Sequence, residues 1–385
     1  MQLKRILELL KINKEKSLYH RYINNDHIAP LLENLNANFA IDNVGTSVNN
    51  EPIFTIKVGN GSKRILMWSQ MHGNESTATK SLFDILNYFK HENQFSNTIL
   101  KECTLKIIPI LNPDGARLYT RVNGNNIDLN RDAQDLSQPE SIVLLDVFND
   151  FKPNFCFNLH GQRTIFSAGK ISNPATLSFL APAQDIETTV TKNRKQAMEV
   201  VVKMNEMLQQ VIPNQIGIYD DHFNLSCVGD TFQSNNVPTI LFEAGYSAND
   251  YDREQVREYL GLALMTSLNY IANNNVTGKL YEYYFDIPMN EKLFFDIIIR
   301  NAKLKVGAEN VDIAFQYQEI LTNNKIEFIP TIDSIGKLNS KFGHLEIDAK
   351  NQLVQSFKTE TLYKGYESNS VMINNELFAL KPINN

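Results

Sequence analysis

The sequence predicts an α/β fold, in which a mixed central β-sheet is flanked by helices and followed by a small, mostly β C-terminal domain. Short apolar runs of strand length alternate with amphipathic helical patterns over the first 275 residues. Beyond that point the helical patterns give way to alternating apolar and aromatic runs. A chain of 385 residues fits one large domain plus a smaller one. We therefore expect a large α/β domain over residues 1–275 and a small β-rich domain over residues 279–385.

The N-terminal part alternates helices and strands. Residues 1–37 interrupt apolar residues with charges and are predicted to form two helices. Apolar runs at 53–58 and 64–68 predict two strands, and residues 59–62 between them (Gly-Asn-Gly-Ser) have the composition of a hairpin turn. Apolar residues at helical spacing over 78–89 then predict a helix.

A strand and a polar loop follow. Residues 104–110 are apolar and predict a short buried strand, which ends in the strong turn sequence Asn112-Pro113-Asp114-Gly115. Residues 120–132 are almost entirely polar and turn-prone. This stretch is too short for a linker and is rich in groups that bind anions or carboxylates.

Two further apolar runs place titratable side chains at strand ends. Residues 155–161 predict a buried strand that carries His160 at its carboxyl end, and residues 238–245 predict another that ends near Glu243. Open α/β sheets place their functional sites at the carboxyl ends of strands. Both residues are therefore candidates for one site.

Helices and a β-rich tail complete the chain. Apolar residues at helical spacing predict helices over 197–211 and 256–268, and the polar stretch 273–278 is the expected domain boundary. Asn323-Asn324 is a hairpin signal in the tail. The predicted tail strands share apolar and aromatic runs, and they lie at 280–286, 292–299, 311–317 and 325–329.

Composition excludes several classes of function. The net charge of −6 comes without a basic block, so neither nucleic acid nor an anionic membrane surface is an expected partner. There is no run of eighteen apolar residues, and the N-terminus resembles an amphipathic helix more than a signal peptide, so a cytoplasmic location is expected. Cys103, Cys156 and Cys227 form no C-x-x-C pair and are expected to be buried, reduced thiols. The sequence leaves the oligomeric state open.

His72 and Glu75 lie where a predicted strand passes into a predicted helix. Imidazole and carboxylate make up two thirds of the His, His, Glu set that holds a catalytic zinc ion and leaves a position for water. Alone, the pair also fits an exposed turn histidine and a glutamate at a helix N-terminus. With His160 and Glu243, however, the chain has two imidazoles and a carboxylate for a metal, and a further carboxylate for proton transfer.

The ordered set resembles the zinc carboxypeptidase family of metallopeptidases, which includes the pancreatic digestive carboxypeptidases. The resemblance covers roughly residues 15–270, and it rests on five motifs in the family's order: His72-x-x-Glu75, Arg121, Asp128-Leu129-Asn130-Arg131, His160 and Phe242-Glu243. It implies the family's central mixed sheet flanked by helices. It also implies that His72, Glu75 and His160 bind one Zn²⁺ ion per chain and that Glu243 is the general base and acid.

The resemblance implies roles for five more residues. Arg121 would polarise the scissile carbonyl and stabilise the oxyanion, as a cation aimed at developing charge does. Asn130 and Arg131 would bind the terminal carboxylate of the substrate, which suits a guanidinium. Asp128 would orient the first zinc-binding histidine from its far ring nitrogen. Tyr219 is the candidate for the family's substrate-capping tyrosine, although its surroundings match the family poorly.

The substrate side chain is expected to be selected by residues 227–236. Asp230 in that segment would attract a basic side chain or cap a turn. Asp220, Asp221 and His222 could form a second metal cluster, although their composition favours a solvated loop.

The predicted function is that of a zinc metallocarboxypeptidase, which hydrolyses a C-terminal amide bond of a peptide. One alternative is an N-acyl amino acid deacylase of the aspartoacylase and succinylglutamate desuccinylase type, which uses the same metal set. It is suggested by Asn112-Pro113, by Gly161 after His160 and by the Glu243-Ala244-Gly245 run. Arg121 with Asn123 favours the peptidase. A binding protein without turnover on the same scaffold is the third possibility.

Overall fold

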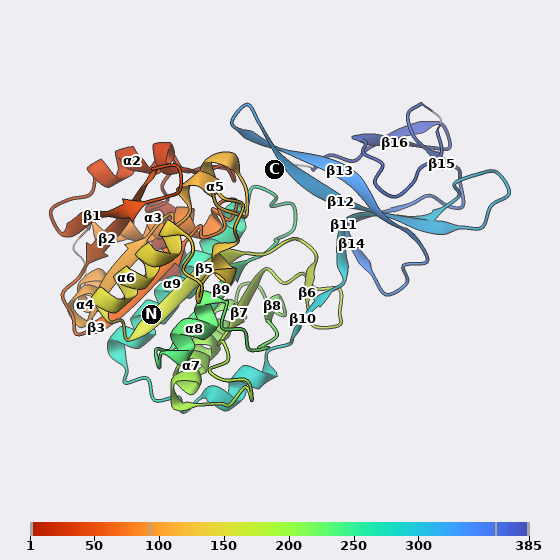
Figure 1. Cartoon of the computed structure of the whole chain (residues 1–385). Helices are drawn as coiled ribbons and strands as arrows, with labels where there is room; N and C mark the ends of the chain where they lie inside the picture. The colour runs from red at the N-terminus through yellow and green to blue at the C-terminus, as the bar shows by residue number, and fades with distance from the viewer. Residues whose placement is uncertain (1–2, 92–93, 359, 383–385) are drawn as a thin grey trace.

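A computed structural model describes residues 3–91, 94–358 and 360–382. An eight-stranded mixed sheet, with strand order β1-β2-β4-β3-β5-β9-β7-β8, lies between helices on both faces, and a β-rich region follows it (Figure 1). The predicted fold class is therefore confirmed. The first predicted helical segment, 1–37, includes residues 1 and 2, which lie outside the described residues.

Parallel pairing at the centre of the sheet sets the geometry of the site. Strand β3 is parallel to both β4 and β5, and β5 is parallel to β9, so the carboxyl ends of these four strands lie at one edge. The strands of this sheet are β1 (Phe39–Thr46), β2 (Pro52–Val58), β3 (Lys63–Ser69), β4 (Cys103–Ile108), β5 (Phe155–Gly161), β7 (Leu177–Leu180), β8 (Ile216–Ile218) and β9 (Thr239–Ala244).

Two apolar layers cover the sheet. One face packs on α1, α2, α3, α4, α7 and α9, and the other packs on α6 and α8. Strands β3 and β5 are apolar on both faces because both layers bury them. The helices are α1 (Leu3–Ile12), α2 (Asn25–Glu33), α3 (Thr77–Phe89), α4 (Gln94–Glu102), α5 (Pro113–Leu118), α6 (Pro139–Phe151), α7 (Lys192–Leu208), α8 (Val228–Ser234) and α9 (Glu254–Asn273), with 3₁₀ turns η1 (Leu129–Arg131) and η2 (Tyr281–Asp286).

The predicted hairpin at residues 59–62 is wrong. Strands β2 and β3 are not paired, because β4 lies between them. The glycines of the connection serve a different purpose, namely close approach to the chain that enters β4. A Cβ atom on Gly59 would lie 2.3 Å from the carbonyl oxygen of Cys103, and one on Gly61 would lie 1.9 Å from the carbonyl carbon of Glu102.

Two further local predictions are corrected. The Asn112–Gly115 turn is the start of helix α5, since the Asn112 side chain accepts a hydrogen bond from Gly115 N and Pro113 occupies the first turn. The strand predicted at 280–286 is the 3₁₀ turn η2, whose Tyr284 is buried against the main body. The turn lies against α7 rather than pairing in a sheet.

The C-terminal region is built from small sheets. One has the order β13-β12-β11-β14, another has the order β15-β16-β17, and β10 pairs with β6 (Phe166–Ala168) of the main body. The hairpin predicted at Asn323-Asn324 is confirmed: both residues have positive φ, 51° and 60°, as a tight turn between β12 and β13 requires. The bounds are β10 (Asn290–Lys292), β11 (Phe294–Ala302), β12 (Val311–Thr322), β13 (Lys325–Gly336), β14 (Phe342–Asp348), β15 (Val354–Gln355), β16 (Ser370–Ile373) and β17 (Glu376–Ala379).

Across the described residues, no helix is both long and apolar enough to cross a membrane. The domain boundary predicted at 275–279 stays a prediction.

Candidate zinc site

Three neighbouring strands deliver the predicted metal and base residues. His72 and Glu75 follow β3 in the turn before α3, His160 lies near the end of β5, and Glu243 lies near the end of β9. His160 and Glu243 are direct partners in the β5–β9 register, so their side chains start from adjacent positions. The carboxyl edge of the parallel strands therefore gathers all four residues.

The turn that carries His72 and Glu75 is held in an unusual backbone conformation. Gln70 has a φ of 45°, and its side-chain amide donates to the carbonyl oxygens of Gly73 at 2.7 Å and Ile23 at 3.0 Å. A Cβ atom on Gly73 would lie 1.9 Å from the carbonyl carbon of Gly115, so glycine alone allows the turn to pack against α5.

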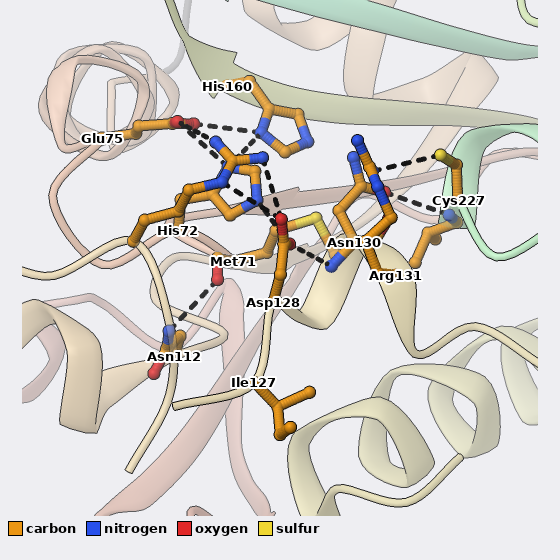
Figure 2. A network of polar contacts seen from close by, with 12 residues as sticks. Met71, His72, Glu75, Asn112, Ile127, Asp128, Asn130, Arg131, His160 and Cys227 are labelled. Atoms are coloured by element: carbon orange, nitrogen blue, oxygen red, sulfur yellow. Dashed lines mark hydrogen bonds and ion pairs between the residues drawn. The ribbon is translucent and has the colours of Figure 1, made fainter. Parts of the chain in front are cut away.

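His72, Glu75 and His160 converge on one point (Figure 2). The Nδ1 atoms of the two histidines are 3.0 Å apart, and each lies 3.0 Å from an oxygen of Glu75. Among the described residues, this is the one group of three or more His, Cys, Asp or Glu side chains whose donor atoms all lie within 4.8 Å of one another. Asp220, Asp221 and His222 thus do not form a second such cluster.

The donor set fits a zinc ion. Two ring nitrogens 3.0 Å apart can share only one proton, whereas a cation would satisfy both nitrogens and the carboxylate. The spacing is a little shorter than the roughly 3.4 Å expected between two ligands of one tetrahedral zinc ion. Burial lowers the pKa of His72, but the charge of Glu75 and the hydrogen bond to Asp128 outweigh burial and raise this pKa to about 9. The site therefore attracts positive charge, and a metal would displace the proton.

Asp128 holds the far side of the first histidine. Its Oδ1 atom lies 2.9 Å from Nε2 of His72 and accepts from Asn130 N at 2.9 Å. Burial raises the pKa of Asp128, but the hydrogen bond to His72 outweighs it and holds this pKa well below its usual value. Asp128 is therefore an anion that fixes the ring orientation and leaves Nδ1 directed at the metal position.

Glu243 is buried in a setting that disfavours its charge. Burial and the nearby charge of Glu75 raise the pKa of Glu243 well above its ordinary value. Its Oε2 atom is buried and has no hydrogen-bond partner among the described residues. Nε2 of His160 is likewise buried and without a described partner. A carboxyl with a raised pKa beside a metal set is suited to accept and return a proton.

The predicted arginines and Asn130 line the same cavity, which has a volume of about 620 Å³. Arg121 Nε donates to Asp128 Oδ2 at 3.1 Å, and Arg121 Nη1 lies 3.4 Å from Glu75 Oε1, so its guanidinium faces the metal set. Arg131 Nη1 donates to Asn130 O at 2.6 Å and to Cys227 Sγ at 3.2 Å. Asn130 accepts from Val228 N at 3.0 Å, which ties the pair to the start of α8.

Tyr219 and Asp230 also line this cavity. The Tyr219 hydroxyl donates to Gln162 Oε1 at 2.7 Å, and its ring meets Phe166 edge to face. Asp230 accepts weakly from Asn224 N at 3.3 Å, and burial raises its pKa to about 6. Cys103 and Cys156 are buried free thiols as expected, whereas Cys227 is only partly buried and lines the cavity.

Sequence reasoning missed several cavity residues. Gln162 and Arg163 lie two and three residues after His160, and their position near a candidate ligand could have suggested them. Tyr317 and Glu319 come from β12 in the C-terminal sheet, and Arg253 precedes α9. Those three carry no local pattern that would identify them, because only the tertiary fold brings them to the cavity.

The fold and the site together define the class of protein. It is an α/β protein whose central sheet carries a zinc-type His, Glu, His donor set at its strand ends. Comparison with known proteins identifies the family resemblance. Residues 28–138 match the sequence model of the zinc carboxypeptidase family. The predicted resemblance is therefore confirmed, and so is the predicted zinc cofactor, since the matched family is a zinc family and the donor set can hold the ion.

Individual relatives agree with this result. Carboxypeptidase SOL1 of Arabidopsis thaliana is 28% identical over 137 residues, which cover 31% of this chain and 28% of that protein. Gamma-D-glutamyl-L-diamino acid endopeptidase 1 of Lysinibacillus sphaericus is 35% identical over 89 residues, which cover 21% of this chain and 22% of that protein. The crystal structure of carboxypeptidase A from Helicoverpa armigera has a TM-score of 0.51 at 17% identity, over 69% of this chain and 80% of that one.

The chain spans about a quarter of the length of the curated relatives it matches, 28% and 22%. The solved structure is similar in fold. The matched sequence model and the matched fold are thus both those of carboxypeptidases.

Proposed function

We propose that the protein is a zinc-dependent metallocarboxypeptidase that hydrolyses a C-terminal amide bond of a peptide. One observation carries the proposal: a zinc-type donor set, the buried Glu243 and the side chains of Arg121, Asn130 and Arg131 all line a single cavity. A cavity of about 620 Å³ falls within the size range of small-molecule sites.

Each residue has a step in the proposed reaction. His72, Glu75 and His160 would hold zinc, which when bound lowers the pKa of water and polarises a carbonyl. Glu243, which is buried beside the donor set and has an unpartnered oxygen, accepts a proton from the attacking water and returns it to the departing amine. Arg121 donates to the carbonyl oxygen as negative charge develops there.

Substrate binding would begin with the terminal carboxylate. Arg131 presents a planar guanidinium with parallel donors, and Asn130 adds an amide beside it. Both are anchored to α8, so they would hold the carboxylate at a fixed distance from the metal set. This arrangement supports cleavage of the last peptide bond.

Asp230 suggests an amine-bearing side chain next to the cleaved bond. Its carboxyl is largely buried and lines the cavity with one weak backbone donor, so an incoming ammonium group would compensate its charge. One relative is named for a bond between a γ-D-glutamyl residue and a diamino acid, which also carries an additional amine. We therefore include basic and diamino acid residues among the candidate terminal residues.

The test compares zinc-loaded protein with its Glu243→Gln variant on a library of peptides with free C-termini. We expect release of single C-terminal amino acids by the wild type. The variant should bind the same amount of zinc and lose about 100-fold to 10,000-fold in rate, the range for a general base. Unchanged activity of the variant would contradict the assigned base.

Two alternatives are tested in parallel. An N-acyl amino acid deacylase would cleave acyl amino acids and leave peptides intact, and a panel of both substrate types separates the two activities. A binding protein on this scaffold would release no amino acid from any peptide. A cytoplasmic location and the absence of nucleic-acid or membrane partners stay predictions.

A further inference from the structure

A second cavity adjoins the first. It has a volume of about 280 Å³ and lies on the C-terminal sheet, where residues of β12 and β13 and of the segment before β16 line it. Arg163 and Tyr317 line both cavities. Because these two side chains border both cavities, the cavities adjoin, and the main body and the C-terminal sheet both contribute to their walls. The two adjoining cavities are together called the groove below.

The C-terminal sheet is fixed against the main body at this junction. Glu319 of β12 pairs with Arg21 at 2.7 Å and accepts from the Tyr119 hydroxyl at 2.6 Å. Gln316 donates to the Thr164 hydroxyl at 2.7 Å, and His344 of β14 lies 2.8 Å from the Thr164 carbonyl oxygen. The contacts of Gln316 and Glu319 lie on either side of Tyr317 along β12, so this part of the sheet forms a fixed wall of the cavities.

The two ends of the groove are anchored to different parts of the main body. The residues proposed to bind the terminal carboxylate, Asn130 and Arg131, are tied to the start of α8. The residues of β12 are tied to the segments around Arg21, Tyr119 and Thr164 instead. The donor set lies between these two groups of residues. On one side His72 contacts Asp128, which accepts from Asn130 N, and on the other side His160 is followed three residues later by Arg163. A peptide held by its carboxylate at α8 would therefore extend its upstream residues toward the C-terminal sheet.

The outer cavity presents uncompensated positive charge. Arg163 and Lys364 are both exposed, and within the described part of the chain no hydrogen bond or ion pair engages either side chain. Asp333 is the one carboxylate on the same wall. The excess of cations is confined to the outer cavity, because the main cavity is lined by five arginines and five carboxylates.

We propose that the C-terminal sheet is part of the substrate site and that it binds the peptide segment upstream of the cleaved bond, where Arg163 and Lys364 recognise a carboxylate. This inference rests on the proposed function for the direction in which the peptide lies. The substrate class is thus a peptide with an acidic residue upstream of its terminal residue. A small acyl amino acid would leave the outer cavity empty.

Binding to full-length, zinc-loaded protein tests the proposal, with the Glu243→Gln substitution added to prevent turnover. The probes are N-terminally labelled peptides that differ only upstream, where they carry α-linked glutamate, γ-linked glutamate or glutamine. Fluorescence anisotropy at low salt gives each dissociation constant. We expect at least one glutamate peptide to bind about threefold to tenfold more tightly than the glutamine peptide, as two partly screened charges allow. The preferred linkage would show where the carboxylate lies.

The double charge reversal Arg163→Glu and Lys364→Glu should abolish this preference. Lys337→Glu is the control for a charge reversal outside the site, at half the change in net charge, since Lys337 is an exposed cation that lines neither cavity. Equal binding of all three peptides, or a preference that survives the double reversal, would overturn the proposal. A charge-dependent preference in a protein that hydrolyses no peptide would support carboxylate recognition by Arg163 and Lys364, but it would refute the proposed function and, with it, the placement of that carboxylate upstream of a cleaved bond.

Discussion

Replacing Arg131 with alanine should remove the discrimination between peptides with a free C-terminal carboxylate and peptides with a C-terminal amide. One guanidinium nitrogen of Arg131, Nη1, is already engaged by Asn130 O and Cys227 Sγ, which leaves the remaining N–H groups for a substrate carboxylate. A hydrogen bond to a charged group contributes about 1.5–3 kcal/mol. Because about 1.4 kcal/mol is a factor of ten, kcat/KM for free-acid peptides should fall about 10-fold to 150-fold.

The assay measures kcat/KM for matched free-acid and amidated peptides with the wild type, Arg131→Ala and Arg131→Lys. The lysine variant keeps the charge and loses the forked geometry, so it should fall between the other two. Arg131 is exposed and lies outside the donor set, so zinc content and melting temperature should be unchanged. If the alanine variant lost equal activity on both peptides, Arg131 would not be the carboxylate-binding residue.

Three further outcomes follow from the geometry. Asp128→Asn should weaken zinc affinity about 10-fold to 100-fold in a chelator competition assay, because the anion that orients His72 is lost. Gly73→Ala should lower the melting temperature and the zinc content together, since its Cβ would lie 1.9 Å from Gly115 C and the strain costs about 1–3 kcal/mol or more. Burial lowers the pKa of His344 from 6.5 to about 4, so the unfolded chain takes up this proton first as the pH falls. Stability should therefore decline between pH 6.5 and 4 by up to about 1–3 kcal/mol, and His344→Gln should flatten this part of the urea-denaturation profile.

The central strands of the main sheet were predictable because they are buried on both faces, whereas the largely exposed edge strand β1 was not predicted. The run 155–161 is mostly apolar, and the structure places β5 over the same residues. Strand order was not predictable in the same way. The loop 59–62 has the composition of a hairpin turn, yet β4 enters from 40 residues later and takes the place of the expected partner. Local composition describes the turn, whereas the pairing depends on long-range contacts.

The candidate site likewise contains residues that the sequence pattern reveals and residues that only tertiary contacts bring together. His72, Glu75, His160 and Glu243 stand out because strand ends carry them, and parallel strand ends meet at one edge of a sheet. Glu319 gave no such signal. It lies on an alternating strand of the tail, 298 residues from its partner Arg21, and its charge is matched only in the folded protein. A residue of that kind is found by tertiary contacts alone.

The chain is predicted to divide into domains over 1–275 and 279–385. The segment just after this boundary packs against the main body and indicates a boundary further along the chain. Tyr284 is 2% exposed, and its hydroxyl accepts from Ala181 N at 3.1 Å. Strand β10 then pairs with β6 of the main body. We propose that the main body extends to Lys292, because loss of a buried aromatic side chain alone costs about 3 kcal/mol or more. A chain ending at residue 292 should therefore melt at a clearly higher temperature than one ending at 275. Equal melting temperatures would place the boundary where the sequence predicts it, and a protease-resistant fragment that ends within 294–380 would contradict both positions.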